Sequence, residues 1–133
     1  MNLPINTSDK EILNYIDTWA ETLAKEDYIA AFNMTEHDSY YGWTPELMGK
    51  VISGYGLPGK TKNGIVYKVT SPLTATGERY HYEVERLNSP GKLLGNIYYD
   101  LPLNGEWSDL TATFRLEKAG DYLKVILEEI HVL

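Results

Sequence analysis

The chain contains no cysteine, which excludes disulfide bonds, thiolate catalysis and cysteine-ligated metal sites. Its three histidines, His37, His81 and His131, are far apart in the sequence and could meet only through the fold. A phosphate-binding glycine-rich loop, a His-x-x-x-His pair and a nucleophile elbow are all missing. We therefore expect neither a metal ion nor a cofactor.

Basic charge is also scarce. The sequence has 12 basic and 19 acidic residues, and the acidic ones are spread over both halves. Without a basic patch, nucleic acids and anionic membranes are not expected as partners. No apolar run approaches the roughly 20 residues of a membrane-spanning helix, and no signal peptide is visible at Met1. We expect a cytoplasmic protein, and the acidic surface is typical of solubility, although it also suits a basic protein partner.

The spacing of hydrophobic residues changes once along the chain, from a helical repeat to a strand-like alternation. The length of 133 residues suits one domain over residues 1–133, and 43% hydrophobic residues are enough for a core. The first 56 or so residues repeat with helical spacing, and the rest alternate as strands do. Helices followed by an antiparallel meander indicate an α+β domain, whose sheet can curl around the helices and leave a pocket.

Three helices are expected, and each has a start signal. Two begin with a capping residue plus a supporting residue, and one with a cap alone. These signals are Ser8 with Glu11, Asp27, and Thr44 with Pro45. The helices are predicted over residues 9–24, 28–34 and 45–53, with buried faces that include Ile12, Ile16, Trp19, Ala20, Leu23, Tyr28, Ile29, Ala31, Phe32, Leu47, Met48, Val51 and Ile52.

Five strands are expected after the helices, separated by turns rich in glycine and proline. They are predicted over residues 65–70, 79–87, 93–101, 107–117 and 122–132, while residues 35–43 form an irregular connection or a short strand and 56–64 a loop. In the last strand Leu123, Val125 and Leu127 share one face, but continuing by twos would bring Glu129 and His131 inward. A β-bulge near residues 128–129 would instead restore the apolar face.

Several residues are candidates for catalysis or ligand binding, and for each of them a purely structural or solvent-exposed role is the alternative. His37 or Asp38 could act as a general base beside a tyrosine donor, or simply belong to a solvated loop. Glu129 could tune His131, or both could face solvent. Asp100 is a further carboxylate. Aromatic side chains could line a cavity or only pack the core. The candidate ligand-binding residues are Tyr15, Trp19, Tyr41, Trp43, Tyr82, Tyr99 and His131.

The order of segments resembles the nuclear-transport-factor-2-like superfamily, also called the cystatin-like or SnoaL-like cone domains. The resemblance is carried by residues 19–24 (WAETLA), by 25–32 (KEDYIAAF), which follow as a charged break and a second helix, and by 43–48 (WTPELM) before the meander. Residues 43–58 and 103–111 further resemble a group of small uncharacterised bacterial proteins. The resemblance implies a cone-shaped sheet curved around three N-terminal helices, a pocket at its open end and a homodimer.

That superfamily includes ketosteroid isomerase, scytalone dehydratase, limonene epoxide hydrolase, toxin-immunity proteins and binding modules, so the fold does not fix the function. The catalytic sets of the isomerase and the dehydratase have no matching motifs in this chain. We therefore expect a non-catalytic domain that binds a small apolar or aromatic ligand or a protein partner, an immunity-type protein being the specific form of the latter. The alternative is a cofactor-free lyase, isomerase or hydrolase that uses His, Asp and Tyr side chains as acids and bases.

Overall fold

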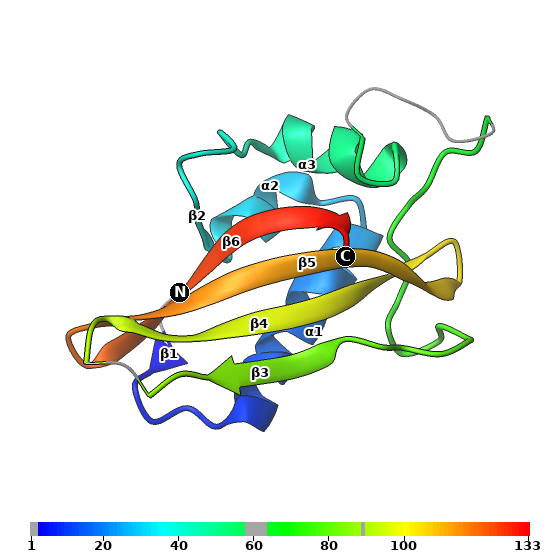
Figure 1. The fold of residues 1–133 in the computed structure, drawn as a ribbon. Helices are drawn as coiled ribbons and strands as arrows, with labels where there is room; N and C mark the ends of the chain where they lie inside the picture. The colour runs from blue at the N-terminus through cyan, green and yellow to red at the C-terminus, as the bar shows by residue number, and fades with distance from the viewer. Residues whose placement is uncertain (1–2, 58–63, 89) are drawn as a thin grey trace.

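The fold combines three helices with a strongly curled, mainly antiparallel sheet that forms a half-barrel, and the last four strands follow the helices (Figure 1). This α+β arrangement confirms the predicted fold class. The computed structural model describes residues 3–57, 64–88 and 90–133. Its helices are α1 (Asp9–Ala24), α2 (Tyr28–Asn33) and α3 (Pro45–Ser53).

Each helix begins where its capping residue predicts. Ser8 and Glu11 form a reciprocal capping box at α1, the side chain of Asp27 accepts the backbone N–H of Ala30, and Thr44 accepts that of Leu47. These caps satisfy backbone donors that the first helical turn leaves without partners. The predicted apolar stripe of α1 is buried, but Ile29 on α2 is 67% exposed, so its expected burial was wrong.

The described part of the sheet has six strands. They are β1 (Leu3–Pro4), β2 (Glu36–His37), β3 (Tyr82–Arg86), β4 (Leu93–Leu103), β5 (Glu106–Ala119) and β6 (Tyr122–Val132). The order is β1-β6-β5-β4-β3, and β2 pairs with β6 in the parallel direction. Two short strands therefore cover the outer edge of β6, one of them, β2, within the segment predicted as a connection or short strand.

The strand predicted over residues 65–70 is not formed. Val69 makes an isolated bridge with Leu103, while the N–H groups of Tyr67 and Thr70 donate to the carbonyl oxygens of Ser53 and Pro102. Alternation alone therefore did not produce a strand here, because the backbone finds partners on several different elements. The predicted loop over 56–64 lies largely outside the described residues.

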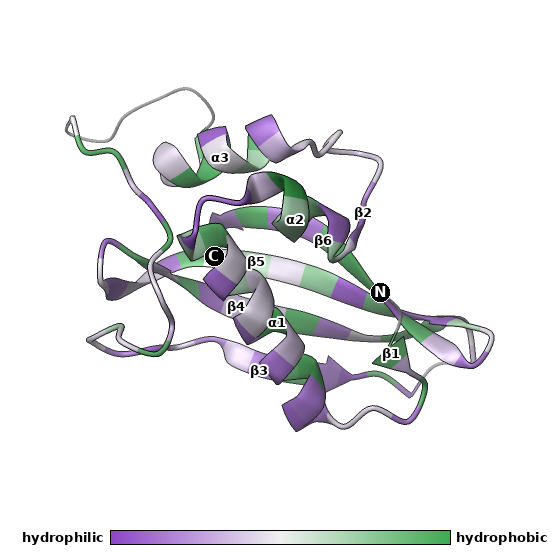
Figure 2. Cartoon of the chain, turned by 180° about the vertical axis from the view of Figure 1, so that it is seen from behind, coloured by the Kyte–Doolittle hydropathy of each residue, from purple (hydrophilic) through white to green (hydrophobic). Residues whose placement is uncertain are grey.

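In Figure 2, α1 and α2 lie over the concave face of the sheet, with α1 across the strands, and α3 lies beside β6. The core lies between them and includes Trp19, Tyr99 and Phe114, all fully buried, with the rings of Trp19 and Phe114 in edge-to-face contact at a centroid distance of 5.1 Å. The predicted inward face of β5, from Leu110 to Leu116, is fully buried as well. The cone is thus filled by side chains at its centre.

The bulge predicted in the last strand is present. Thr113 pairs with Glu129 and the next residue of β5, Phe114, pairs with Leu127, so Glu128 is the extra residue. Beyond it Ile130 points into the core at 3% exposure. Glu129 and His131 consequently belong to the outer face, each with a side chain that is 34% exposed.

Truncation of Ile130 tests whether the bulge at Glu128 turns the Ile130 side chain into the core. Ile130→Ala should lower the free energy of unfolding by about 2–4 kcal/mol, because it leaves a cavity in the packed core. Val132→Ala is the matched control. It removes a side chain that is 48% exposed and should cost under about 1 kcal/mol. Denaturant unfolding of both variants measures the difference, and equal losses would contradict the inward position of Ile130.

Candidate functional site

A groove lies where α3 and the connection before it meet the end of β6. Its volume is about 330 Å³. Most of its surface is apolar, with polar groups from β6 on one side. The lining residues are Tyr41, Trp43, Leu47, Val51, Gly56, Glu129, Ile130 and His131.

The bulge and an indole hold the two sides of this groove together. The Trp43 Nε1–H donates to the carbonyl oxygen of Glu128 at 2.8 Å, across 85 residues of sequence. Leu47 and Val51 are four residues apart on α3 and so share a face.

Gly56 passes close to β6, because a Cβ on it would lie 3.9 Å from His131 Cα. A larger residue would be strained there, since Gly56 also has a φ of +93°.

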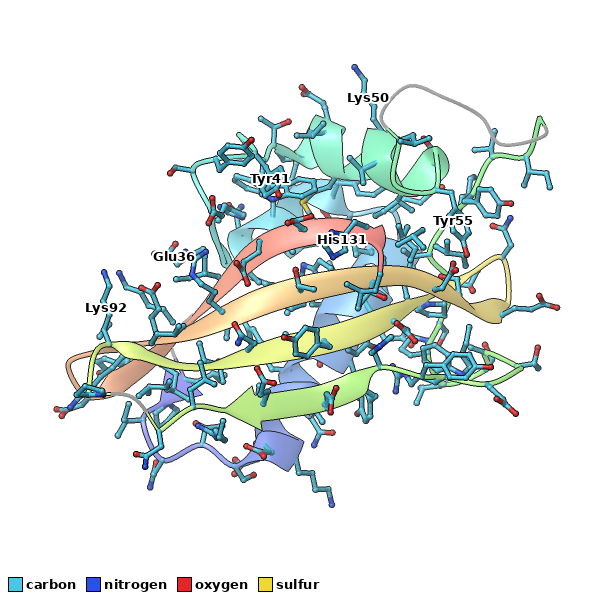
Figure 3. All side chains as sticks on the ribbon, viewed as in Figure 1. Glu36, Tyr41, Lys50, Tyr55, Lys92 and His131 are labelled. Atoms are coloured by element: carbon cyan, nitrogen blue, oxygen red, sulfur yellow. The ribbon has the colours of Figure 1, made fainter. Side chains whose placement is uncertain are left out.

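The polar side of the groove is formed by Glu129, His131 and Tyr41. The carboxylate of Glu129 pairs with His131 Nδ1. A hydrogen bond to Glu129 also raises the pKa of Tyr41 to about 12, because loss of the phenolic proton would place two negative charges together. His131 Nε2 is buried without a hydrogen-bond partner among the described residues. Figure 3 shows Tyr41 and His131 near the same strand, β6.

Three of the candidate ligand-binding residues, Tyr41, Trp43 and His131, therefore come together in the groove. The other four do not. Trp19 and Tyr99 are in the core, and the Tyr15 hydroxyl donates to the carbonyl oxygen of Met34 beside a more open hollow. Tyr82 lies at the edge of the sheet next to α1.

Tyr82 and Tyr99 have a shared partner in Asp17, which accepts both hydroxyls at 2.7 Å. Burial, together with this hydrogen bond, raises the pKa of both phenols. The guanidinium of Arg79 lies 3.7 Å from the Tyr82 ring centre and 3.8 Å from that of Trp107. Arg79 was predicted as the first residue of a strand and not as a site residue, but it lies in an irregular segment before β3.

The proposed bases are used in the fold: His37 attaches β2 to α2, and Asp38 attaches the residues after β2 to the sheet. His37 Nε2 lies 2.8 Å from the carbonyl oxygen of Phe32, and its ring stacks on the Phe32 ring. Burial lowers the pKa of His37. Asp38 pairs with Arg115, and that hydrogen bond lowers the pKa of its carboxyl. Their hollow, with a volume of about 410 Å³, is larger and more open than the groove, and charged side chains line most of it.

Asp100 is fully buried and has a full set of donors. Its carboxylate accepts the backbone N–H groups of Tyr80 and His81 at 3.0 and 2.9 Å and the Thr111 hydroxyl at 2.7 Å, and it lies 3.0 Å from His81 Nδ1. These contacts fix the chain where it enters β3. Asp100 is therefore an anchor of the fold rather than part of the groove.

No family model, curated protein or solved structure matches the chain in our comparisons. Among the described residues, no group of three or more His, Asp or Glu side chains is placed to hold a metal ion. Within the same residues, no helix has both the length and the apolar character needed to span a membrane.

The role of Asp100 can be tested by Asp100→Asn. An amide nitrogen would face the donors that the carboxylate now accepts, so the free energy of unfolding should fall by about 2–4 kcal/mol. Asp121→Asn, in the exposed turn before β6, makes the same chemical change and should have little effect. A similar melting temperature for the two variants would contradict the anchoring role.

The hydrogen bond between Tyr41 and Glu129 should be visible in the pH titration of the Tyr41 phenol. Because the phenol donates only while protonated, the bond is complete below pH about 10 and is lost as the pH rises through the Tyr41 pKa of about 12. In Glu129→Gln the pKa of Tyr41 should move back toward the ordinary value of about 10. The ¹³Cζ shift of Tyr41, assigned with Tyr41→Phe, reports it. Glu128→Gln is the control and should leave the pKa raised.

Proposed function

We propose that this protein is a non-catalytic binding domain that holds a small ligand with an apolar or aromatic body in the groove between α3 and β6. The observation that carries the proposal is the composition of that groove. Trp43, Leu47 and Val51 supply apolar walls, and a few polar groups gather at one side. A volume of about 330 Å³ is within the range of small-molecule sites.

The distribution of the acid–base candidates also supports binding over catalysis. His37, Asp38 and Asp100 lie outside the groove, and each already has partners within the fold. General acid–base catalysis needs such groups within hydrogen-bond reach of one substrate. A binding site needs only complementary surface.

One observation favours the alternative, a cofactor-free lyase, isomerase or hydrolase. Tyr41 and His131 both contact Glu129, so a phenol, a carboxylate and an imidazole converge at the groove. This set could move a proton between two positions of a bound substrate. All three side chains are partly exposed, which suits a shallow binding site better than a reaction that must exclude water.

The same groove could also accept a side chain of a protein partner, including the basic partner that an immunity-type role implies. The net charge of −7 and the exposure of Tyr40, at 83%, beside the groove support this form of the proposal. A protein partner would cover a surface well beyond the groove, whereas a small ligand would be confined to it.

Chemical-shift mapping with ¹⁵N-labelled protein and a panel of small aromatic alcohols, amines and acids tests the proposal. We expect saturable shifts at the Trp43 indole and at residues 129–131. Leu47→Trp should abolish them by filling the groove, whereas Leu73→Trp, at a position that is 87% exposed, should leave them unchanged. Shifts confined to other surfaces, or none at all, would reject the groove. Turnover of a bound compound that is lost in Glu129→Gln would establish the enzymatic alternative instead.

A further inference from the structure

The charged side chains of the described groove lining are of one sign, negative. Among the lining residues that the structure describes, Glu129 is the only Asp, Glu, Lys or Arg. Arg115, on the outer face of the sheet, is committed to the carboxylates of Asp38, Glu117 and Glu128. Lys50 projects from α3 away from the sheet (Figure 3). A ligand in the groove therefore meets a carboxylate that no lysine or arginine of the described lining offsets.

Hydrogen-bond acceptors predominate on the same side. A carboxylate has about four lone-pair sites, and the partners of Glu129 given by the structure are His131 Nδ1 and the Tyr41 hydroxyl. His131 Nε2 is buried and has no partner among the described residues, so the acceptor that a ligand can reach on this side is the Glu129 carboxylate. The polar side of the groove thus suits a ligand that donates hydrogen bonds.

Aromatic rings stand next to these acceptors. The Tyr41 and Trp43 ring centres are 6.2 Å apart with the planes inclined at 39°, and Tyr40 meets Tyr41 edge to face. Because the indole N–H of Trp43 is already bonded to Glu128, this ring offers its face rather than its donor. Aromatic faces attract ammonium groups, tryptophan most strongly.

We infer that the groove selects organic cations: an ammonium group beside the Glu129 carboxylate, with the apolar body of the ligand against Trp43, Leu47 and Val51. The inference rests on the proposed binding function and specifies its ligand class. An anionic ligand would face Glu129 directly, and a neutral one would leave the carboxylate without a matching charge. A free amine and the side chain of a lysine-bearing peptide share this chemistry.

Three probes with a phenyl group and different polar ends test the inference. Phenethylamine is cationic, 2-phenylethanol is neutral and phenylacetate is anionic, and the Trp43 indole and Ile130 amide signals follow their binding. We expect the amine to bind at least about tenfold more tightly than the alcohol, and phenylacetate to bind most weakly. The preference should weaken as salt is added, because part of it is charge attraction.

Glu129→Gln should bring the amine and the alcohol to similar affinities. Glu83→Gln is the matched control, because Glu83 lies on the same outer face in the row Glu83, Tyr98, Thr113, Glu129 but three strands away, and it should retain the preference. Comparison of N-acetyl-lysine methylamide with phenethylamine distinguishes a peptide source from a free amine, since tighter binding of the former indicates a lysine side chain.

The outcomes separate this inference from the proposed function. Equal binding of amine and alcohol by the unmodified protein would overturn cation selection and leave the binding groove standing. Tightest binding of phenylacetate would overturn it in the same way. Failure of all three probes to shift the groove signals would overturn both. Because the ratio is measured first on the unmodified protein, the result does not depend on the stability of any variant.

Discussion

The hydrogen bond from the Trp43 indole to the Glu128 carbonyl joins the last strand to the connection that leads into α3. The bulge makes that carbonyl available, since Glu128 is the residue without a counterpart on β5. The same extra residue places Ile130 in the core and Glu129 and His131 outside it. The position of α3, the filling of the core and the polar side of the groove thus all depend on one irregularity in the ladder.

The parts of the fold that depend on local signals could be predicted from the sequence. Ser8, Asp27 and Thr44 cap their helices because each cap needs only the next three residues. The bulge at Glu128 was predictable too, because a strict alternation would have placed two ionisable side chains in the core. In such cases the cost of the alternative is visible in the sequence itself.

Other features depend on distant partners and could not be found that way. Residues 65–70 alternate as a strand does, yet their backbone bonds with the end of α3, with the last residues of β4 and with the turn after β4. Trp19, Tyr99 and Trp43 are all large aromatic residues, and the sequence does not distinguish them as ligand contacts. In the structure α1 and β4 carry Trp19 and Tyr99 into the core. Of the expected site, the sequence could name Tyr41, Trp43 and His131. Leu47 and Val51 were seen only as the buried face of a helix.

The two edges of the sheet are protected from further strand pairing in different ways. The outer edge of β6 is covered by β1 and β2, which pair with its residues 122–123 and 126–127, and then by Trp43 and α3 (Figure 1). At the other edge, β3 has only five residues, and Glu83, Glu85 and Arg86 are three of them. Short, charged edge strands resist the addition of further strands. The curled sheet is therefore protected against edge-to-edge aggregation by cover on one side and by charge on the other.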